Sequence, residues 1–425
     1  MNDLERIEDK TTDNLYRKFV LVMLTLVYVF NFIDRQLIVI LQESIKKDLL
    51  LSDTQLGLLS GFTFAIFYVT LGIPLARLAD KGNRKNIVAI SLGLWSIMTA
   101  ISGFSRNYTQ LLLARIGVGI GEAGGSPPAH AMISDYFPTE KRSTALSVYS
   151  TGIYIGVLIG FVFGGYLNQE LGWRTAFYTL GTPGILFSIL FYFTVKEPRK
   201  GATDKTQYVE NETYTFQQVL KFLISKKTFV YLALASGLHA FCIYGLFNWA
   251  PSFLARLHGM QNSDIGISLG LIFGFSGGIG TFAGGFLTDY FGKVDKLWYL
   301  KIPTYAVLLS IFFIIGALFL HNTTLSLACI GVSVFLQSMY LGPVISVAHS
   351  LVPANMRALC SAILFLVINL LGLGFGPLVV GMLSDALKTS LGAESLRWAM
   401  SCIALVAVVS AVLFTISIRK MEKEI

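Results

Sequence analysis

Charged residues are scarce in this chain: Asp, Glu, Lys and Arg make up 14% of its 425 residues, against about 25% in soluble domains. Hydrophobic residues make up 54%, which excludes a disordered chain, because such chains are poor in apolar side chains. The shortage of charge also argues against a single soluble globule. The apolar residues are enough for roughly ten to twelve membrane spans of about 20 residues each.

Sequence patterns of other protein classes are also missing. No CxxC pair and no metal-ligand spacing of histidines occurs, so neither a metal site nor a disulfide framework is indicated. The glycine-rich stretches lack a GKS or GKT ending, and no HExxH is present, so we expect no nucleotide cofactor and no enzyme. The net charge of +8 does not indicate nucleic acid, because membrane proteins collect Lys and Arg in cytoplasmic loops.

Twelve long apolar segments follow a polar start at residues 1–16. In lipid only helices and closed barrels satisfy the backbone, and the alternating pattern of barrel strands is absent, so each segment is predicted to be a transmembrane helix. The predicted spans are 17–42, 56–77, 87–104, 111–133, 144–167, 173–195, 229–257, 265–290, 299–320, 326–350, 357–383 and 395–418.

One long polar interruption, residues 196–228, separates six spans from six. It predicts two domains, 1–195 and 229–425, joined by a cytoplasmic linker. Placing both termini inside puts 24 Lys and Arg on the inner side and 7 on the outer side. This bias predicts a multi-pass protein of the cell inner (plasma) membrane with both termini in the cytoplasm.

The two halves repeat each other. Asp80 and Asp289 lie in similar segments, 76–85 and 285–293, at an offset of 209 residues, and Arg142 and Arg357 end similar loops at an offset of 215. Near-equal offsets indicate one duplicated six-helix unit. Many secondary transporters are built in this way, with the substrate site between the halves.

The segment after the second span, with Asp80-Lys81 and Arg84-Lys85, resembles the signature of the major facilitator superfamily. This resemblance implies an all-α integral membrane protein: twelve transmembrane helices in two pseudo-symmetric six-helix bundles, the major facilitator fold. It also implies transport by alternating access. Glycines at every fourth position in 152–164 are similar to the antiporter motif of that family.

Two further stretches resemble the Spinster family. They are Asn-Phe-Ile-Asp-Arg at 31–35, and the run from Arg115 through Glu122 to Pro127 that continues to Arg142. Animal members move sphingosine-1-phosphate and lysophospholipids, so the resemblance implies a lipid-like amphiphile as substrate. The compact chain indicates a bacterial member, and we expect a monomer surrounded by membrane lipids.

Four charges lie well inside the spans: Asp34, Arg35, Arg115 and Glu122. Each costs about 2.5–3.5 kcal/mol at the bilayer centre, so they should be paired or face a wet cavity. Arg115 and Glu122 are seven residues apart and share a helix face, whereas Asp34 and Arg35 point about 100° apart. We predict that all four bind substrate and that Glu122 and Asp34 carry protons. The alternative is an ion-pair network that only joins spans 1 and 4.

Interior polar groups of the second half are neutral, such as His239, Gln337 and Asn369. We predict that His239 and Asn369 contact substrate, although a core histidine is an equal alternative. A cavity with one charged wall and one mostly apolar wall suits an amphiphile better than a small polar solute.

A third set of charges lies at the cytoplasmic ends of spans, where we predict an inner gate. Asp80 is expected to face the amino terminus of a helix in the other half, where the helix dipole favours an anion. The alternative is ordinary positive loop charge. The predicted gate consists of Asp80, Arg84, Lys85, Arg142, Asp289 and Arg357.

These observations predict a proton-coupled secondary active transporter that exports an amphiphilic, lipid-like substrate. Two alternatives remain open. Arg35 and Arg115 would also suit the carboxylate of a small organic anion, carried by proton coupling. An uncoupled lipid scramblase would ignore a pH gradient that a coupled carrier follows.

Overall fold

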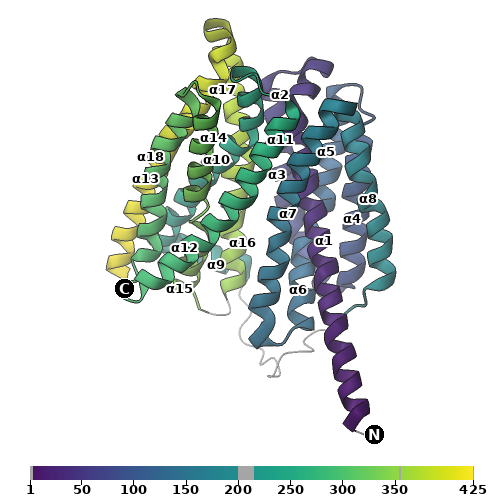
Figure 1. Ribbon diagram of the computed structural model, residues 1–425. Helices are drawn as coiled ribbons and strands as arrows, with labels where there is room; N and C mark the ends of the chain where they lie inside the picture. Colours follow the sequence, from purple (N-terminus) through teal and green to yellow (C-terminus); the bar gives the residue numbers. More distant parts are fainter. Residues whose placement is uncertain (1–2, 200–214, 354–355, 425) are drawn as a thin grey trace.

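The computed structural model describes residues 3–199, 215–353 and 356–424, without the side chains of 3–13, 73, 76, 77, 80, 81, 139, 140, 143, 358 and 424. All regular structure in these ranges is helical. The helices stand side by side in two groups, one for each half of the sequence (Figure 1). Both termini lie at the same end of the molecule, which we call the termini side; the opposite end is the far side.

The first half contributes six spans. They are formed by α1 (Asp3–Leu49); α2 (Asp53–Gly57), η1 (Leu58–Phe62) and α3 (Thr63–Lys81); α4 (Arg84–Ser102); α5 (Tyr108–Ala123) and α6 (Ser126–Tyr136); α7 (Thr139–Leu171); and α8 (Trp173–Thr194).

The second half has the same organisation. Its spans are α10 (Lys227–Leu257); α11 (Asn262–Leu271), η2 (Ile272–Ser276) and α12 (Gly277–Gly292); α13 (Trp298–Phe319); α14 (Thr323–Gln337) and α15 (Leu341–Ser350); α16 (Arg357–Ile368), η4 (Asn369–Phe375) and α17 (Gly376–Leu391); and, after the short η5 (Gly392–Glu394), α18 (Ser395–Glu424).

The prediction of twelve helical spans is confirmed in the described ranges. Ten segments are long and apolar enough to cross a membrane; the last of them, Leu359–Lys423, holds two spans, and the broken pair α5–α6 makes the twelfth. The first helix is longer than its predicted span, because it continues through polar residues at both ends. The fourth span breaks at 124–125 and the tenth at 338–340, which composition did not predict.

Part of the predicted linker lies outside the described residues. Its last third forms a short helix, α9 (Phe216–Ser225), which packs on α10 and α16. Thr215 and Gln218 form a capping box at its start, and Val219 and Leu223 are buried. This amphipathic pattern explains why a helix forms in a polar segment. The domain boundaries at 195 and 229 stay a prediction.

Glycines let the two halves touch backbone to backbone near the far side. Where α7 crosses α11, a Cβ on Gly266 would lie 2.4 Å from the carbonyl oxygen of Phe161, and one on Gly165 would lie 2.4 Å from that of Asn262. Gln169 at the end of α7 also accepts a 2.7 Å hydrogen bond from the hydroxyl of Ser263. No residue with a Cβ fits this crossing without a shift of one half against the other.

We predict that Gly266→Ala destabilises this arrangement, because the added methyl group must displace the carbonyl of Phe161. Overpacking of this kind costs about 1–3 kcal/mol, so the melting temperature of the purified protein in detergent should fall. Gly285→Ala in the same span is the control, since nothing lies within 4 Å of its Cβ position. Equal melting temperatures for the two variants would contradict the tight crossing.

Candidate functional site

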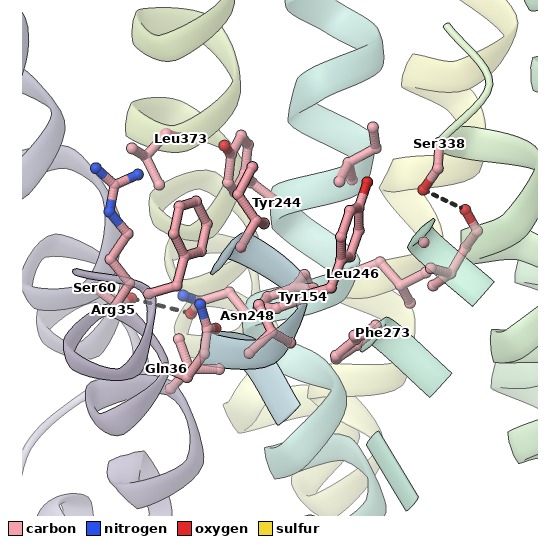
Figure 2. Close-up of a pocket in the computed structure, with 18 of the residues that line it drawn as sticks. Arg35, Gln36, Ser60, Tyr154, Tyr244, Leu246, Asn248, Phe273, Ser338 and Leu373 are labelled. Carbon is pink, nitrogen blue, oxygen red and sulfur yellow. Dashed lines mark hydrogen bonds between the residues drawn. The ribbon is translucent and has the colours of Figure 1, made fainter. Parts of the chain in front are cut away.

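A cavity of about 190 Å³ lies between the two halves (Figure 2). In the close-up, Arg35 of the first half and Ser338 of the second half lie on opposite sides of it. The first-half wall is formed by Phe32, Arg35, Gln36, Val39, Ser60, Phe64, Arg115, Ile153, Tyr154 and Val157. The second-half wall is formed by Ile243, Tyr244, Leu246, Phe247, Asn248, Phe273, Gly277, Val334, Gln337, Ser338 and Leu373.

An ion pair between Arg35 and Glu122 lies at the charged wall. Nε of Arg35 donates to Oε2 of Glu122 over 2.6 Å, and the Glu122 side chain is fully buried. The guanidinium group of Arg35 also stands about 5 Å from three rings, those of Phe32, Phe64 and Tyr68. This pairing joins α1 to α5 inside the membrane, where an isolated charge would be costly.

Arg115 is the second arginine at the cavity, and its side chain is 1% exposed. Its Nε and Nη1 have no hydrogen-bond acceptor among the described residues. Its guanidinium group lies 5.7 Å from the ring of Phe64, on which Arg35 also stands. A buried guanidinium group with unused N–H donors at a cavity is suited to an anionic group of a ligand.

The direct partner of Glu122 comes from the first span, as in the alternative of an ion-pair network between spans 1 and 4. Arg115 and Glu122 share a face of α5, but the direct partner of Glu122 is Arg35. Asp34 lies behind the cavity wall, 1% exposed, with no hydrogen-bond donor for its Oδ2 among the described residues. It remains close enough to Glu122 and Arg115 to interact electrostatically.

The two predicted contacts of the second half do not line the cavity. His239 is buried, and its Nε2 lies 2.8 Å from the carbonyl oxygen of Gln337. Its ring packs edge-on against Tyr340. Asn369 is the first residue of the π-helical turn η4 and is half-buried. We therefore leave His239 and Asn369 out of the site proposed below.

Other polar residues at the cavity were not among the predicted substrate contacts. Asn248 accepts a 3.0 Å hydrogen bond from Ser60, and this bond links the two halves beside the cavity (Figure 2). Gln36 is buried on α1, and Tyr154 reaches in from α7. Each is an ordinary polar residue in an apolar run, so only the helix arrangement identifies it.

An open cleft extends from the cavity toward the termini side, between α7 and α12. It is lined by Arg142, Leu146, Ser147, Ser150, Thr151, Tyr154, Gly278, Thr281 and Phe282. Tyr154 belongs to both the cavity and the cleft, and its hydroxyl donates a 2.9 Å hydrogen bond to Thr281. Tyr154 thus stands between the cavity and a cleft that opens toward the termini side.

Arg84 and Lys85 of the predicted gate bind partners in their own half. Arg84 donates to Asp135 over 2.5 Å and to Glu197 over 2.8 Å. The backbone N–H of Lys85 donates to Glu197, and its ammonium group lies 4.3 Å from the ring of Tyr192. These contacts fasten the start of α4 to α6 and to the segment after α8.

The remaining predicted gate residues are spread over the termini side. Arg142 lines the cleft, Asp289 accepts a 2.7 Å hydrogen bond from the hydroxyl of Tyr299, and Arg357 is exposed at the start of α16. Asp80 lies in the last turn of α3, and its side chain is outside the described part of the structure. The gating role of this set stays a prediction.

A cluster of ion pairs that sequence reasoning missed closes the far side; we call it the far-side lock. At its centre is the carboxylate of Asp53, which is 2% exposed. It accepts from Arg256 of α10 at 2.7 and 2.8 Å, from Ser384 of α17 at 2.6 Å and from Lys46 of α1. Arg256 also donates to Glu43 at 2.6 Å. The lock therefore joins both halves.

Asp385 adds a third carboxylate to the far-side lock, beside Asp53 and Glu43. Its carboxylate accepts from the backbone N–H groups of Asp53 and Thr54 at 3.0 and 2.7 Å, at the amino terminus of α2. An anion there satisfies N–H groups that have no partner within the helix. Sequence reasoning expected this device at Asp80, on the termini side. Lys46 and Arg256 belong to the seven Lys and Arg that the charge count places on the outer side.

Twelve membrane spans in two similar halves, with a buried polar cavity between them that is closed on the far side, define a secondary transporter. The family model described as Major Facilitator Superfamily matches residues 24–377. The chain therefore belongs to the major facilitator superfamily.

Individual relatives narrow this similarity. The chain is 33% identical to an MFS-type efflux pump of Mycolicibacterium smegmatis, over 95% of this chain and 93% of the relative. It is 26% identical to a hexuronate transporter of Bacillus subtilis, over 92% of this chain and 93% of that transporter. A crystal structure of a bacterial homologue of the human lysosomal transporter Spinster, inward-facing and unoccupied, has a TM-score of 0.88 at 31% identity, covering 96% of this chain and 98% of that one. The resemblance to Spinster proteins is thereby confirmed.

Arg256→Met is predicted to open the far side. The substitution leaves Asp53 and Glu43 without their shared guanidinium partner, which costs the closed arrangement about 3–5 kcal/mol. A cysteine at Val39 in the cavity wall, in a background without the native cysteines, should then react faster with an impermeant reagent added on the far side.

The matched control for the far-side lock is Arg174→Met. Arg174 pairs with Asp48, but both side chains are more than a third exposed, and such pairs contribute about 0–1 kcal/mol. Its labelling rate should equal that of the parent protein. If Arg256→Met also leaves the rate unchanged, the lock does not hold the far side closed.

Proposed function

We propose that this protein is a proton-coupled transporter that exports amphiphilic, lipid-like molecules by alternating access. The observation that carries the proposal is the unequal lining of the cavity. Arg35 and Arg115 stand on one wall, and apolar side chains such as Leu246, Phe247 and Phe273 form much of the other. An anionic head group would bind the arginines, and its tail would contact the apolar wall.

The proton site in this proposal is the pair of Glu122 with Arg35. Protonation of Glu122 would remove the partner of Arg35 and free a second guanidinium group for the substrate. An incoming anion would in turn compete with Glu122 for Arg35. The carboxylate of Asp34, buried beside this pair, would take part in the same exchange. Proton and substrate are thus coupled through one guanidinium group.

The termini side is the cytoplasmic side in this proposal, because the bias of Lys and Arg places both termini inside the cell inner membrane. The cavity would then load from the cytoplasm through the cleft between α7 and α12 and release its substrate when the far-side lock opens. Asp80, Arg142 and their counterparts in the second half would brace the opposite state. We propose a monomer, since one chain contains the whole cavity.

A small organic anion is the second candidate substrate. The unused N–H donors of Arg115 suit a carboxylate, and one relative is a hexuronate transporter. An uncoupled scramblase is the candidate from another class. The response of transport to a pH gradient distinguishes the proposed carrier from a scramblase. The dependence of affinity on tail length distinguishes a lipid-like substrate from a small anion.

Glu122→Gln should abolish the response of transport to a pH gradient. The amide keeps the shape of the side chain but cannot bind and release a proton as a carboxylate does. The measurement is uptake of a labelled lysophospholipid into liposomes with and without the gradient. Counterflow without a gradient should persist in the variant, which shows that the cavity still works. Full gradient-driven flux in Glu122→Gln would make the residue structural, and a parent protein indifferent to the gradient would support the scramblase.

Affinity should rise with the length of the substrate tail. Each buried methylene contributes about 0.8 kcal/mol, or about fourfold in the dissociation constant, until the apolar wall is filled. The measurement is binding of lysophosphatidic acids with tails of increasing length to the purified protein. Glucuronate, which has no tail, is the comparison for the small-anion alternative. A flat series together with tight binding of glucuronate would contradict the lipid assignment.

A further inference from the structure

The tenth span ends its first helix at the cavity with a polar residue. Gln337 is the last residue of α14, and α15 starts four residues later at Leu341. The side chain of Gln337 lines the cavity from the second-half wall. This wall had been expected to be mostly apolar, so an amide group there needs an explanation.

The amide of Gln337 is buried and unused by the protein. The residue is 2% exposed, and neither Oε1 nor Nε2 has a hydrogen-bond partner among the described residues. A primary amide offers two donors and an acceptor with two lone pairs. Buried polar groups in folded proteins are almost always hydrogen-bonded, and Gln337 is a cavity-lining residue, so a water or ligand in the cavity is the candidate partner of this amide.

The backbone of Gln337 is held in place from α10. Its carbonyl oxygen lies 2.8 Å from Nε2 of His239, and a carbonyl can only accept, so Nε2 carries the proton. The His239 ring packs edge-on against the Tyr340 ring, with 4.4 Å between the ring centroids. This bond satisfies a carbonyl at the end of α14 and fixes the point from which the amide side chain enters the cavity.

The internal repeat places Gln337 at the position that Glu122 holds in the first half. Gln337 follows Glu122 by 215 residues, the same offset that relates Arg357 to Arg142. Both residues lie where a span breaks: Glu122 is the second-last residue of α5, and Gln337 is the last residue of α14. Glu122 binds Arg35 on the charged wall, whereas the side-chain amide of Gln337 has no hydrogen-bond partner in the described part of the chain.

We propose that Gln337 is a hydrogen-bonding subsite that binds the neutral polar linker of the substrate, the hydroxyl, ester or amide group between an anionic head and an apolar tail. The inference rests on the proposed function. An uncharged amide can both donate to a linker carbonyl and accept from a linker hydroxyl, while the anionic head binds the arginines of the opposite wall. Apolar neighbours such as Val334 and Phe273 then contact the start of the tail.

Two phosphate amphiphiles with the same twelve-carbon chain test this assignment. Dodecyl phosphate has no linker, whereas 1-lauroyl-lysophosphatidic acid carries an ester and a free hydroxyl. The full-length parent protein should bind the second more tightly. Gln337→Leu should weaken binding of lauroyl-lysophosphatidic acid about tenfold, the loss of roughly one hydrogen bond, and change binding of dodecyl phosphate less than twofold.

Ser333→Ala is the matched control on the same helix, because Ser333 is not among the cavity-lining residues and its hydroxyl already donates a 2.9 Å bond to the carbonyl of Ile330. It should leave both affinities unchanged. Gln337→Met, which keeps the length of the side chain, guards against a packing defect, and melting temperatures verify that each variant is folded.

Two outcomes overturn the subsite while leaving the proposed function in place. If the Gln337 variants bind both amphiphiles equally more weakly, the residue has a structural role. If both affinities are unchanged, Gln337 does not contact the ligand. A folded parent protein that binds neither amphiphile but does bind glucuronate overturns the proposed function, and the linker assignment with it. Failure to bind any of the three ligands has the same consequence.

Discussion

The carboxylate of Asp53 is the group on which the described arrangement of the two halves depends. It is almost completely buried and is held by cations and a hydroxyl from three helices of both halves, α1, α10 and α17. Breaking a buried pair of this kind is costly because the remaining charge loses its compensation. Since these contacts all lie at the far side, they join the halves there, whereas on the termini side a cleft opens between α7 and α12. A change of state must exchange the whole cluster for water together.

Close backbone contact makes this closure tight. The crossing of α7 and α11 leaves no room for a Cβ at Gly165 or Gly266, so the halves meet there without intervening side chains. A single added methyl group is enough to prevent this crossing, so the contact is either fully formed or absent. This favours two discrete arrangements of the halves over a continuous range. The ion pairs and the glycine crossing therefore both stabilise closure of the far side, the ion pairs through charge and the glycines through close packing.

Breaks in the fourth and tenth spans place the polar groups at the cavity. Irregular backbone at membrane depth is tolerated only where it is enclosed by protein or lines a cavity. In both halves a polar residue lies within two residues of the break: Glu122 is the second-last residue of α5, and Gln337 is the last residue of α14. The duplicated unit has thus kept the position and changed the chemistry: a charged partner for Arg35 on one wall and an unpaired amide on the other.

The twelve spans, the repeat and the family could be derived from the amino-acid sequence, because lipid allows few alternatives to a helix for a long apolar run, and because the repeat preserves recognisable loops. The charged residues inside the first half could also be identified from the sequence, since each is an exception in an apolar segment. The sequence did not show which residue pairs with which. Glu122 binds an arginine 87 residues away in the chain rather than the one on its own helix face, and Asp53 binds Arg256 across 203 residues. Such partners depend on how helices cross and how far side chains reach, and neither is encoded in local hydropathy. The sequence by itself thus determined a helical transporter with buried charges; only the tertiary structure decided which charges meet, which side is closed and which polar groups are left for a ligand.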